Sequence, residues 1–155
     1  MTRIITFFCF FFISPVLLLA QDSLKSQLNG FIDEWHADAA RADIRAYFDK
    51  IDPEGIYIGT DPVEHWTKEE FFDYAKPYFD KGKAWSFKAV ERNLYFAKDS
   101  TVAWFDEKLE SSSGPLRGSG VLQLNHGGWK IIYYVLSVPI PNDKFREVRK
   151  VISNN

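Results

Sequence analysis

The feature that most constrains this chain is a change of hydrophobic period at Gly82. Before Gly82, apolar residues recur every three or four positions, which is typical of helices that bury one face. After Gly82 they alternate, and short breaks separate four strand candidates: 84–97, 101–111, 115–125 and 129–138. The breaks are of hairpin length, so these strands are predicted to form an antiparallel meander. Helices followed by a meander, within 155 residues, predict a single α+β domain.

Three helices are predicted in the first half. The first is capped by Asp22 or Ser23 and has one apolar face, which contains Leu24, Leu28, Phe31, Ile32, Trp35 and Ala39. A short second helix follows Asp43. The third begins at the capping box of Thr67 and is predicted to end near Gly82, bent or shortened by Pro77.

Residues 52–55 are predicted to form a turn, followed by a short strand at 56–58. In the strand candidate 84–97 the apolar residues change face in mid-strand, because Trp85 and Ala89 have the opposite parity to Leu94. A bulge near Val90 would reconcile the two halves and curve the sheet. A bent sheet wrapped on helices leaves a cone with an open end, where small ligands bind.

The last strand candidate is apolar on both faces. Ile131, Tyr133 and Val135 share one parity, and Ile132, Tyr134 and Leu136 share the other. Only one face can line the core, so the other needs cover, either from a second copy in a homodimer or from the tail, where 144–152 is predicted to be helical.

The first 20 residues have the form of a secretory signal peptide. A positive start at Arg3 precedes an apolar run from Ile4 to Ala20, and Ala20 is a small residue at the expected cleavage site. The alternative is an uncleaved membrane anchor, for which the run is short and contains Pro15. Cleavage would leave one domain at 21–155, periplasmic or secreted, with no membrane association.

The remaining chain lacks the residues for several kinds of site. The only cysteine, Cys9, lies in the signal segment, so disulfides and thiolate chemistry are excluded after cleavage. Without cysteine a structural zinc site is not expected, and we predict no metal and no cofactor. Loss of Arg3 leaves a net charge of −3, which argues against nucleic acid as a partner.

Several short motifs carry a resemblance to a known family. They are Trp35-His36, Ala42-Asp43, Ile58-Gly59-Thr60-Asp61-Pro62, Glu64-His65-Trp66, Arg117-Gly118-Ser119-Gly120 and Gly128-Trp129-Lys130-Ile131. Over about residues 24–141 the chain resembles a SnoaL-like domain of the nuclear transport factor 2-like superfamily. The resemblance implies a cone-shaped fold with N-terminal helices packed on a curved antiparallel sheet. It implies no defined activity, because relatives include isomerases, cyclases, dehydratases, epoxide hydrolases and proteins that only bind or assemble.

Asp61 is the candidate general base. In the similar ketosteroid isomerases an Asp-Pro pair at the end of this strand supplies the base, and Asp61-Pro62 matches that pair. A carboxylate in a partly dry cavity can move a proton beside a carbonyl. The alternative is that Asp61 starts a turn by accepting hydrogen bonds from nearby backbone amides.

His36 is the candidate hydrogen-bond donor. The isomerases use a tyrosine of the first helix and a protonated aspartate of a later strand, and this chain has Trp35-His36 near the tyrosine's place and Asp106 and Glu107 on a later strand. The alternative is a structural histidine at the edge of the apolar helix face.

Glu107 and Arg117 form a second candidate pair. A hairpin between 101–111 and 115–125 would put Glu107 opposite Ser119 and diagonal to Arg117, on one face of the sheet. Inside the cone the pair would suit a ligand carboxylate, whereas outside it would be an ordinary surface ion pair. Gly118 and Gly120 share the other face, where they leave room for a packed ring.

The sequence therefore predicts an exported protein that binds a small, partly apolar molecule. The predicted pocket residues are Trp35, His36, Tyr57, Asp61, Glu64, Trp66, Phe105, Glu107 and Arg117. One alternative is an isomerase- or cyclase-type enzyme with Asp61 as base and His36 as donor. The other is a non-catalytic assembly module whose cone is filled by its own side chains.

Overall fold

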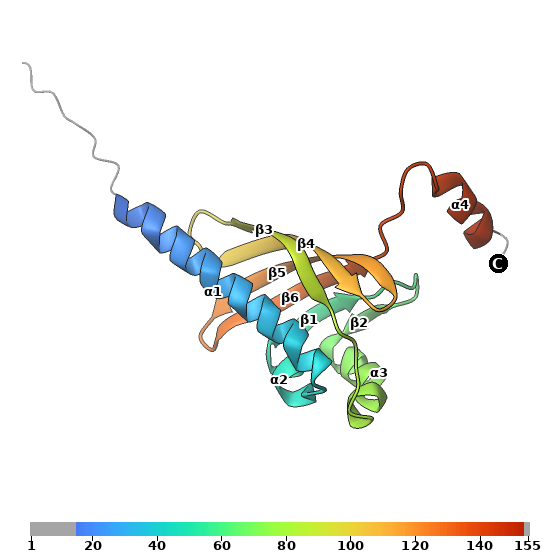
Figure 1. Ribbon diagram of the computed structural model, residues 1–155. Helices are drawn as coiled ribbons and strands as arrows, with labels where there is room; N and C mark the ends of the chain where they lie inside the picture. The colour runs from blue at the N-terminus through green and yellow to red at the C-terminus, as the bar shows by residue number, and fades with distance from the viewer. Residues whose placement is uncertain (1–14, 154–155) are drawn as a thin grey trace, which may run out of the picture.

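The computed structural model describes residues 15–153, with side chains from Gln21 onward (Figure 1). Residues 1–14 of the predicted signal segment lie outside the described residues, and cleavage after Ala20 stays a prediction. The elements, in chain order, are α1 (Pro15–Ala40), α2 (Ile44–Asp49), β1 (Ile51–Ile58), β2 (His65–Thr67), α3 (Lys68–Asp80), β3 (Lys88–Phe96), β4 (Val102–Ser111), β5 (Gly114–Asn125), β6 (Gly128–Ser137) and α4 (Phe145–Ser153).

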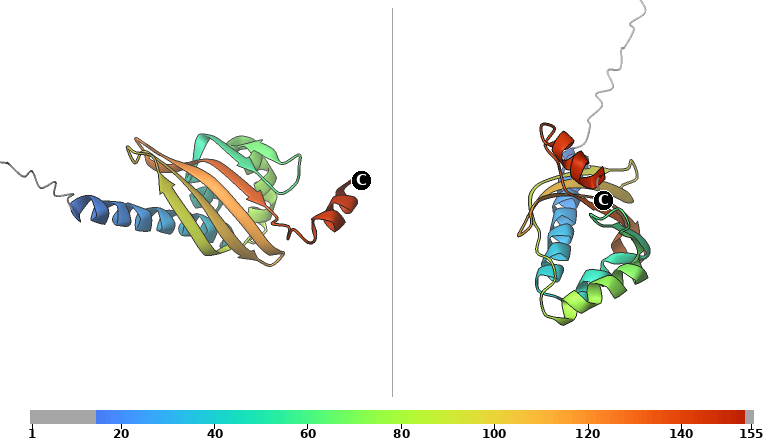
Figure 2. Two further views of the ribbon diagram at one scale, coloured as in Figure 1. Left: turned by 90° about the horizontal axis from the view of Figure 1, so that it is seen from above. Right: turned by 90° about the vertical axis from the view of Figure 1, so that its right-hand side faces the viewer.

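The strands form one curved six-stranded sheet in the order β2-β1-β6-β5-β4-β3. The predicted meander is confirmed, because each strand from β3 to β6 pairs antiparallel with the next strand along the chain. Strand β1 lies beside β6 and runs parallel to it, and β2 adds an antiparallel edge strand that was not predicted. Helix α1 crosses the inner face of the sheet, and α2 and α3 lie at one end (Figure 2). The expected α+β cone is confirmed.

Helix α1 begins earlier than predicted. It starts at Pro15 and passes through Asp22 and Ser23 without interruption, so neither residue caps it. The segment before Asp22 is rich in Leu, which favours helix, and proline is tolerated in a first helical turn. The predicted apolar face is confirmed, because Leu28, Ile32, Trp35 and Ala39 are buried.

The caps of α2 and α3 are as predicted. The Asp43 side chain accepts a hydrogen bond from the backbone N–H of Ala46 at 3.0 Å. Thr67 and Glu70 form a complete capping box at the start of α3. Helix α3 continues through Pro77 to Asp80, so proline does not shorten it, and Gly82 follows with a positive φ of 70°.

Three irregularities shape the sheet. The predicted bulge in β3 is confirmed by a register shift between Ala89 and Glu91. A second shift, at Ile132, lets Ile131 and Tyr134 both face the core although they differ in parity. The predicted turn over 52–55 is instead an irregular stretch inside β1. The bulges explain how a sheet of this size bends far enough to enclose rings.

The C-terminal helix stands apart from the body (Figure 1). Helix α4 contains no buried residue, and its Phe145, Val151 and Ile152 are exposed. Among the residues that the structure describes, no helix combines the length and apolarity that crossing a membrane requires.

Candidate functional site

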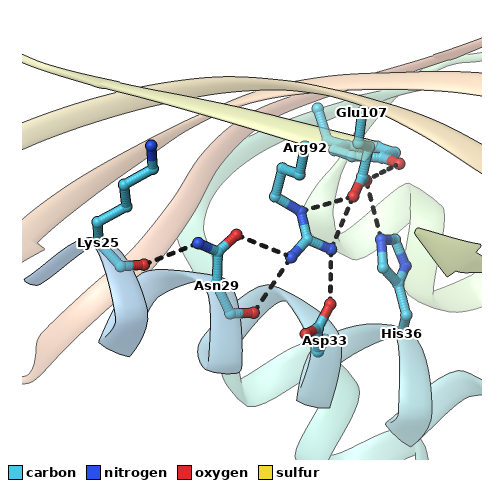
Figure 3. Close-up of polar contacts among 7 residues, drawn as sticks. Lys25, Asn29, Asp33, His36, Arg92 and Glu107 are labelled. Carbon is cyan, nitrogen blue, oxygen red and sulfur yellow. Dashed lines mark hydrogen bonds and ion pairs between the residues drawn. The ribbon is translucent and has the colours of Figure 1, made fainter. Parts of the chain in front are cut away.

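Glu107 is the centre of a buried polar cluster inside the cone (Figure 3). Nε2 of His36 lies 2.8 Å from its Oε1, and the hydroxyl of Tyr134 donates to the same oxygen at 3.0 Å. Arg92 donates from Nε to Oε2 at 2.9 Å, and its Nη2 lies 2.8 Å from that oxygen. Both carboxylate oxygens therefore have close partners, as a buried charge requires.

Arg92 joins this cluster to α1. Its Nη2 also lies 2.8 Å from Oδ1 of Asp33, and its Nη1 donates to the backbone oxygen of Asn29 at 3.2 Å. The guanidinium is thus held between strand β4 and helix α1 (Figure 3). The cluster ties a helix to the sheet across the inside of the cone.

Local sequence explains why Glu107 faces inward. The inward residues of β4 alternate as Ala103, Phe105, Glu107 and Leu109, all of them buried. Opposite Glu107 stands Gly118, where a Cβ atom would lie 2.2 Å from the Tyr134 hydroxyl oxygen and 2.7 Å from Oε1 of Glu107. The absence of a side chain at Gly118 therefore makes room for the Tyr134 ring and its hydrogen bond. The sequence predicted room for a packed ring here, but the face predicted for Gly118 is wrong, because Gly118 pairs with Glu107 and shares its face.

The charges of the cluster follow from these contacts. Burial acts to raise the pKa of Glu107, but the hydrogen bond and charge of His36 together with Arg92 outweigh it, so the pKa lies below its usual 4.5. Burial, and then the charge of Glu107, raise the pKa of Tyr134 well above 10. At neutral pH Glu107 is an anion with both oxygens occupied and Tyr134 is a neutral donor. The cluster is therefore suited to hold the fold rather than to exchange protons with a ligand.

Aromatic rings occupy most of the interior in front of this cluster. Tyr134 has its ring centre 4.8 Å from Trp35 and 5.5 Å from Tyr57, and Trp35 stacks on Tyr47 at 5.0 Å. Tyr57 in turn stacks on Phe71 at 3.9 Å. Space remains near the open end of the cone, beyond Tyr57 and Phe71.

That space is a pocket of about 140 Å³ between β1, β2, α3 and the segment before β3. It is lined by Tyr57, Gly59, Thr60, Glu64, Trp66, Phe71, Tyr74, Trp85, Phe87 and Leu136. A cavity of about 150 Å³ accepts a molecule the size of benzene. The pocket is therefore large enough for a small ligand or for one end of a longer one.

Three of the predicted pocket residues line this pocket: Tyr57, Glu64 and Trp66. Trp35 and Phe105 lie deeper, as buried core residues. His36, which is 4% exposed, opens toward a separate crevice of about 370 Å³ between α1 and the start of β3. The structure thus divides the predicted set between the pocket, the core, the polar cluster and, for Asp61 and Arg117, the exposed surface.

Asp61 lies in the turn between β1 and β2, where it is exposed. Its Oδ1 accepts a hydrogen bond from the backbone N–H of Val63 at 3.0 Å, and its own N–H donates to Oε2 of Glu64 at 3.1 Å. This is the geometry of a turn-forming aspartate. The catalytic roles of Asp61 and His36 stay predictions, and the structure does not bring the two side chains into one pocket.

The predicted arrangement of Glu107 and Arg117 is wrong. Glu107 pairs with Gly118 and not with Ser119, and Arg117 pairs with Lys108, whose side chain is on the other face of β4. Arg117 is exposed on the outer face. The hairpin closes between Ser111 and Gly114, one residue tighter than the predicted alignment, and Gly114, just after the turn, has a positive φ of 106°.

Arg92, the actual charge partner of Glu107, was missed by the sequence analysis. Its inward orientation follows from the bulge at Val90, after which Arg92, Leu94 and Phe96 share one parity. Tyr74 and Phe87 were missed as pocket residues, because a helix and a loop bring them to the pocket from distant parts of the chain.

Comparison with known proteins gives a family and a fold. The model of the SnoaL-like domain matches residues 28–141. No functionally curated protein matches the chain.

Solved structures of similar fold are distant in sequence. An NTF2-like protein of unknown function from Pseudomonas putida is 12% identical, with a TM-score of 0.65 over 79% of this chain and 92% of that one. A proposed dehydratase of the NTF2-like family from Streptomyces avermitilis is 13% identical, with a TM-score of 0.63 over 78% and 99%. The association domain of C. elegans CaMKII is 14% identical, with a TM-score of 0.62 over 77% and 98%. At this identity the likeness extends to the fold alone.

Proposed function

Since the chain belongs to the SnoaL-like domain family and has the NTF2-like fold, we propose that it binds a small, partly apolar molecule in the pocket at the open end of its cone. The observation that supports this proposal is the pocket of about 140 Å³, walled by six aromatic side chains and Leu136. Concave apolar sites with a few polar groups are where small molecules bind.

The polar groups of the pocket suit orientation of a ligand. Glu64 and Thr60 lie on one side, and the hydroxyl groups of Tyr57 and Tyr74 add donors. We place this binding outside the cytoplasm, in the periplasm or the medium, on the strength of the predicted signal segment at 1–20.

The experiment is a ligand-observed NMR screen of small aromatic and aliphatic fragments against the full chain. Binding should weaken at least about fivefold when Trp66 is replaced by Ala, because the ring supplies a wall of the pocket. Phe145→Ala is the control, since Phe145 lies on α4, outside the pocket and the sheet, and is 59% exposed. If no fragment binds, or if both variants weaken binding equally, the proposed function is wrong.

An assembly role is the second candidate, and a feature of the outer sheet face favours it. Tyr95, Trp104, Val121, Tyr133 and Ile56 are direct neighbours across five strands, one residue per strand. Tyr95, Trp104 and Tyr133 are 46%, 45% and 38% exposed. A continuous exposed apolar row of this kind is typical of a protein–protein interface, and we propose that a second copy of the chain covers it.

A further inference from the structure

We propose that the ligand of the open-end pocket is a small organic cation, recognised through an alkylated ammonium group. This inference rests on the proposed binding function and adds the charge and chemical class of the ligand. Two independent properties of the pocket carry it: the nature of its walls and the sign of its charge.

The walls are aromatic on both sides. From α3 and β2, Trp66 stacks on Tyr74 with 4.5 Å between ring centres and lies 5.6 Å from Phe71. From the segment before β3, Trp85 and Phe87 form the other side. The π-face of an aromatic ring is negative, so a ring that turns its face to the ligand would attract a cation and hold an alkylated ammonium group without the need for hydrogen bonds.

The only charged residue among those that line the pocket is Glu64. Its side chain packs over Gly59, where a Cβ atom would lie 2.0 Å from Oε2, and Oε2 accepts the N–H of Asp61. No donor from the described residues reaches the other oxygen, Oε1. The carboxylate is thus fixed in position by the turn and keeps one oxygen for a ligand.

The two tyrosines near Glu64 stay neutral. Burial, and then the charge of Glu64, raise the pKa of Tyr57, while burial, Tyr78 and Glu64 raise the pKa of Tyr74 to about 12. Neither tyrosine therefore adds a charge at neutral pH, and Glu64 is the one acidic or basic residue among the described lining residues. An anionic ligand would meet a carboxylate, with no Lys, Arg or His from the described lining residues to offset it.

The size of the pocket agrees with this class of ligand. A volume of about 140 Å³ accepts a benzene-sized group, and a trimethylammonium group is of comparable bulk. The rest of the molecule would extend past Thr60 toward solvent. A cation that is apolar on its surface also fits walls with few hydrogen-bonding groups.

The test compares choline with 3,3-dimethyl-1-butanol, its neutral carbon isostere, by titration calorimetry on the full chain. Choline should bind at least about fivefold more tightly than the isostere, because only choline gains from the rings and the carboxylate. Glu64→Gln should weaken choline binding by a similar factor and leave the isostere unchanged. Glutamine keeps an acceptor for the Asp61 N–H, so the turn should survive.

The matched control is Glu54→Gln, which removes one carboxylate from an exposed position outside the pocket and should change neither affinity. Equal binding of choline and isostere, or an equal effect of the two Glu variants, would overturn the cation proposal while leaving a binding pocket. Failure of choline, of the isostere and of the whole fragment screen would instead overturn the proposed function.

Discussion

Glu107 is the buried carboxylate at the centre of the polar cluster, so the stability of the fold depends on it. It is 1% exposed, and removing its charge would leave Arg92 buried beside the exposed Asp33 as its remaining partner. Breaking a buried ion pair from one side costs about 3–5 kcal/mol. We therefore expect Glu107→Gln to lower the free energy of unfolding by about 3 kcal/mol in urea denaturation at about pH 7.

The same residue gives a pH prediction. The pKa of Glu107 in the folded chain lies below 4.5, so its ionisation stabilises the fold above that pH, and this contribution is lost as pH falls through the folded pKa. The difference in unfolding free energy between the wild type and Glu107→Gln should therefore shrink below about pH 4.5. A difference that is constant between about pH 7 and pH 3 would contradict an ionised Glu107.

Replacement of glycine by alanine should have opposite effects on stability at Gly118 and at Gly30. Gly118→Ala would drive a Cβ atom into the Tyr134 hydroxyl and Glu107, at 2.2 Å and 2.7 Å, and should destabilise the fold by about 1–3 kcal/mol. Gly30, inside α1, has nothing within 4 Å of its Cβ position, so Gly30→Ala should stabilise the fold by about 0.5–1 kcal/mol. Melting temperatures of the two variants should move in opposite directions, and a common direction would contradict this account of Gly118.

At the scale of elements, helix α3 connects stability with the pocket. Its N-terminus is held by Thr67, whose side chain accepts the N–H of Glu70 while Glu70 accepts the N–H of Thr67. We expect Thr67→Ala to cost about 1 kcal/mol in urea denaturation. Because α3 carries Phe71 and Tyr74, the variant should also weaken ligand binding. Thr67→Ser, which keeps the cap, should behave as the wild type.

Elements were easier to predict from sequence than their mutual arrangement. The four long strands and the caps at Asp43 and Thr67 follow from local patterns, which depend on neighbours in the chain. The position of Arg117 could not be predicted this way, because the register of β4 on β5 depends on a turn one residue tighter than the breaks suggested. A shift of one residue changes which side chains share a face.

The pocket residues show more clearly how far side-chain positions can be predicted from local sequence. Tyr57, Glu64 and Trp66 could be predicted, since they lie together around one turn and next to the resemblance motifs. Tyr74 and Phe87 reach the pocket only through the packing of α3 and the segment before β3 on the sheet. For Asp61 the sequence left two roles open, and the turn-forming alternative agrees with the structure, because its Oδ1 accepts the backbone N–H of Val63.

At the scale of the whole molecule, two apolar surfaces remain uncovered. One is the outer row of Tyr95, Trp104, Val121, Tyr133 and Ile56, in which Tyr95 and Trp104 stack with 6.0 Å between ring centres. The other belongs to α4, where Phe145, Val151 and Ile152 are exposed. A nine-residue helix is marginal in water by itself, so α4 gains little stability without a partner surface.

The outer row is the stronger candidate for an interface, because it is continuous across five strands and forms part of the sheet itself. A twofold contact between two such rows would bury the aromatic rings of both copies with one kind of surface. We therefore expect the full chain to sediment as a dimer and Trp104→Arg to shift it to monomer, since a buried unpaired guanidinium is costly. Tyr78→Arg is the control, because Tyr78 lies on α3, away from the row, and is 44% exposed, almost the same as Trp104 at 45%. A wild type that sediments as a monomer, or a dimer that survives Trp104→Arg, would contradict the outer row as the interface and direct attention to α4.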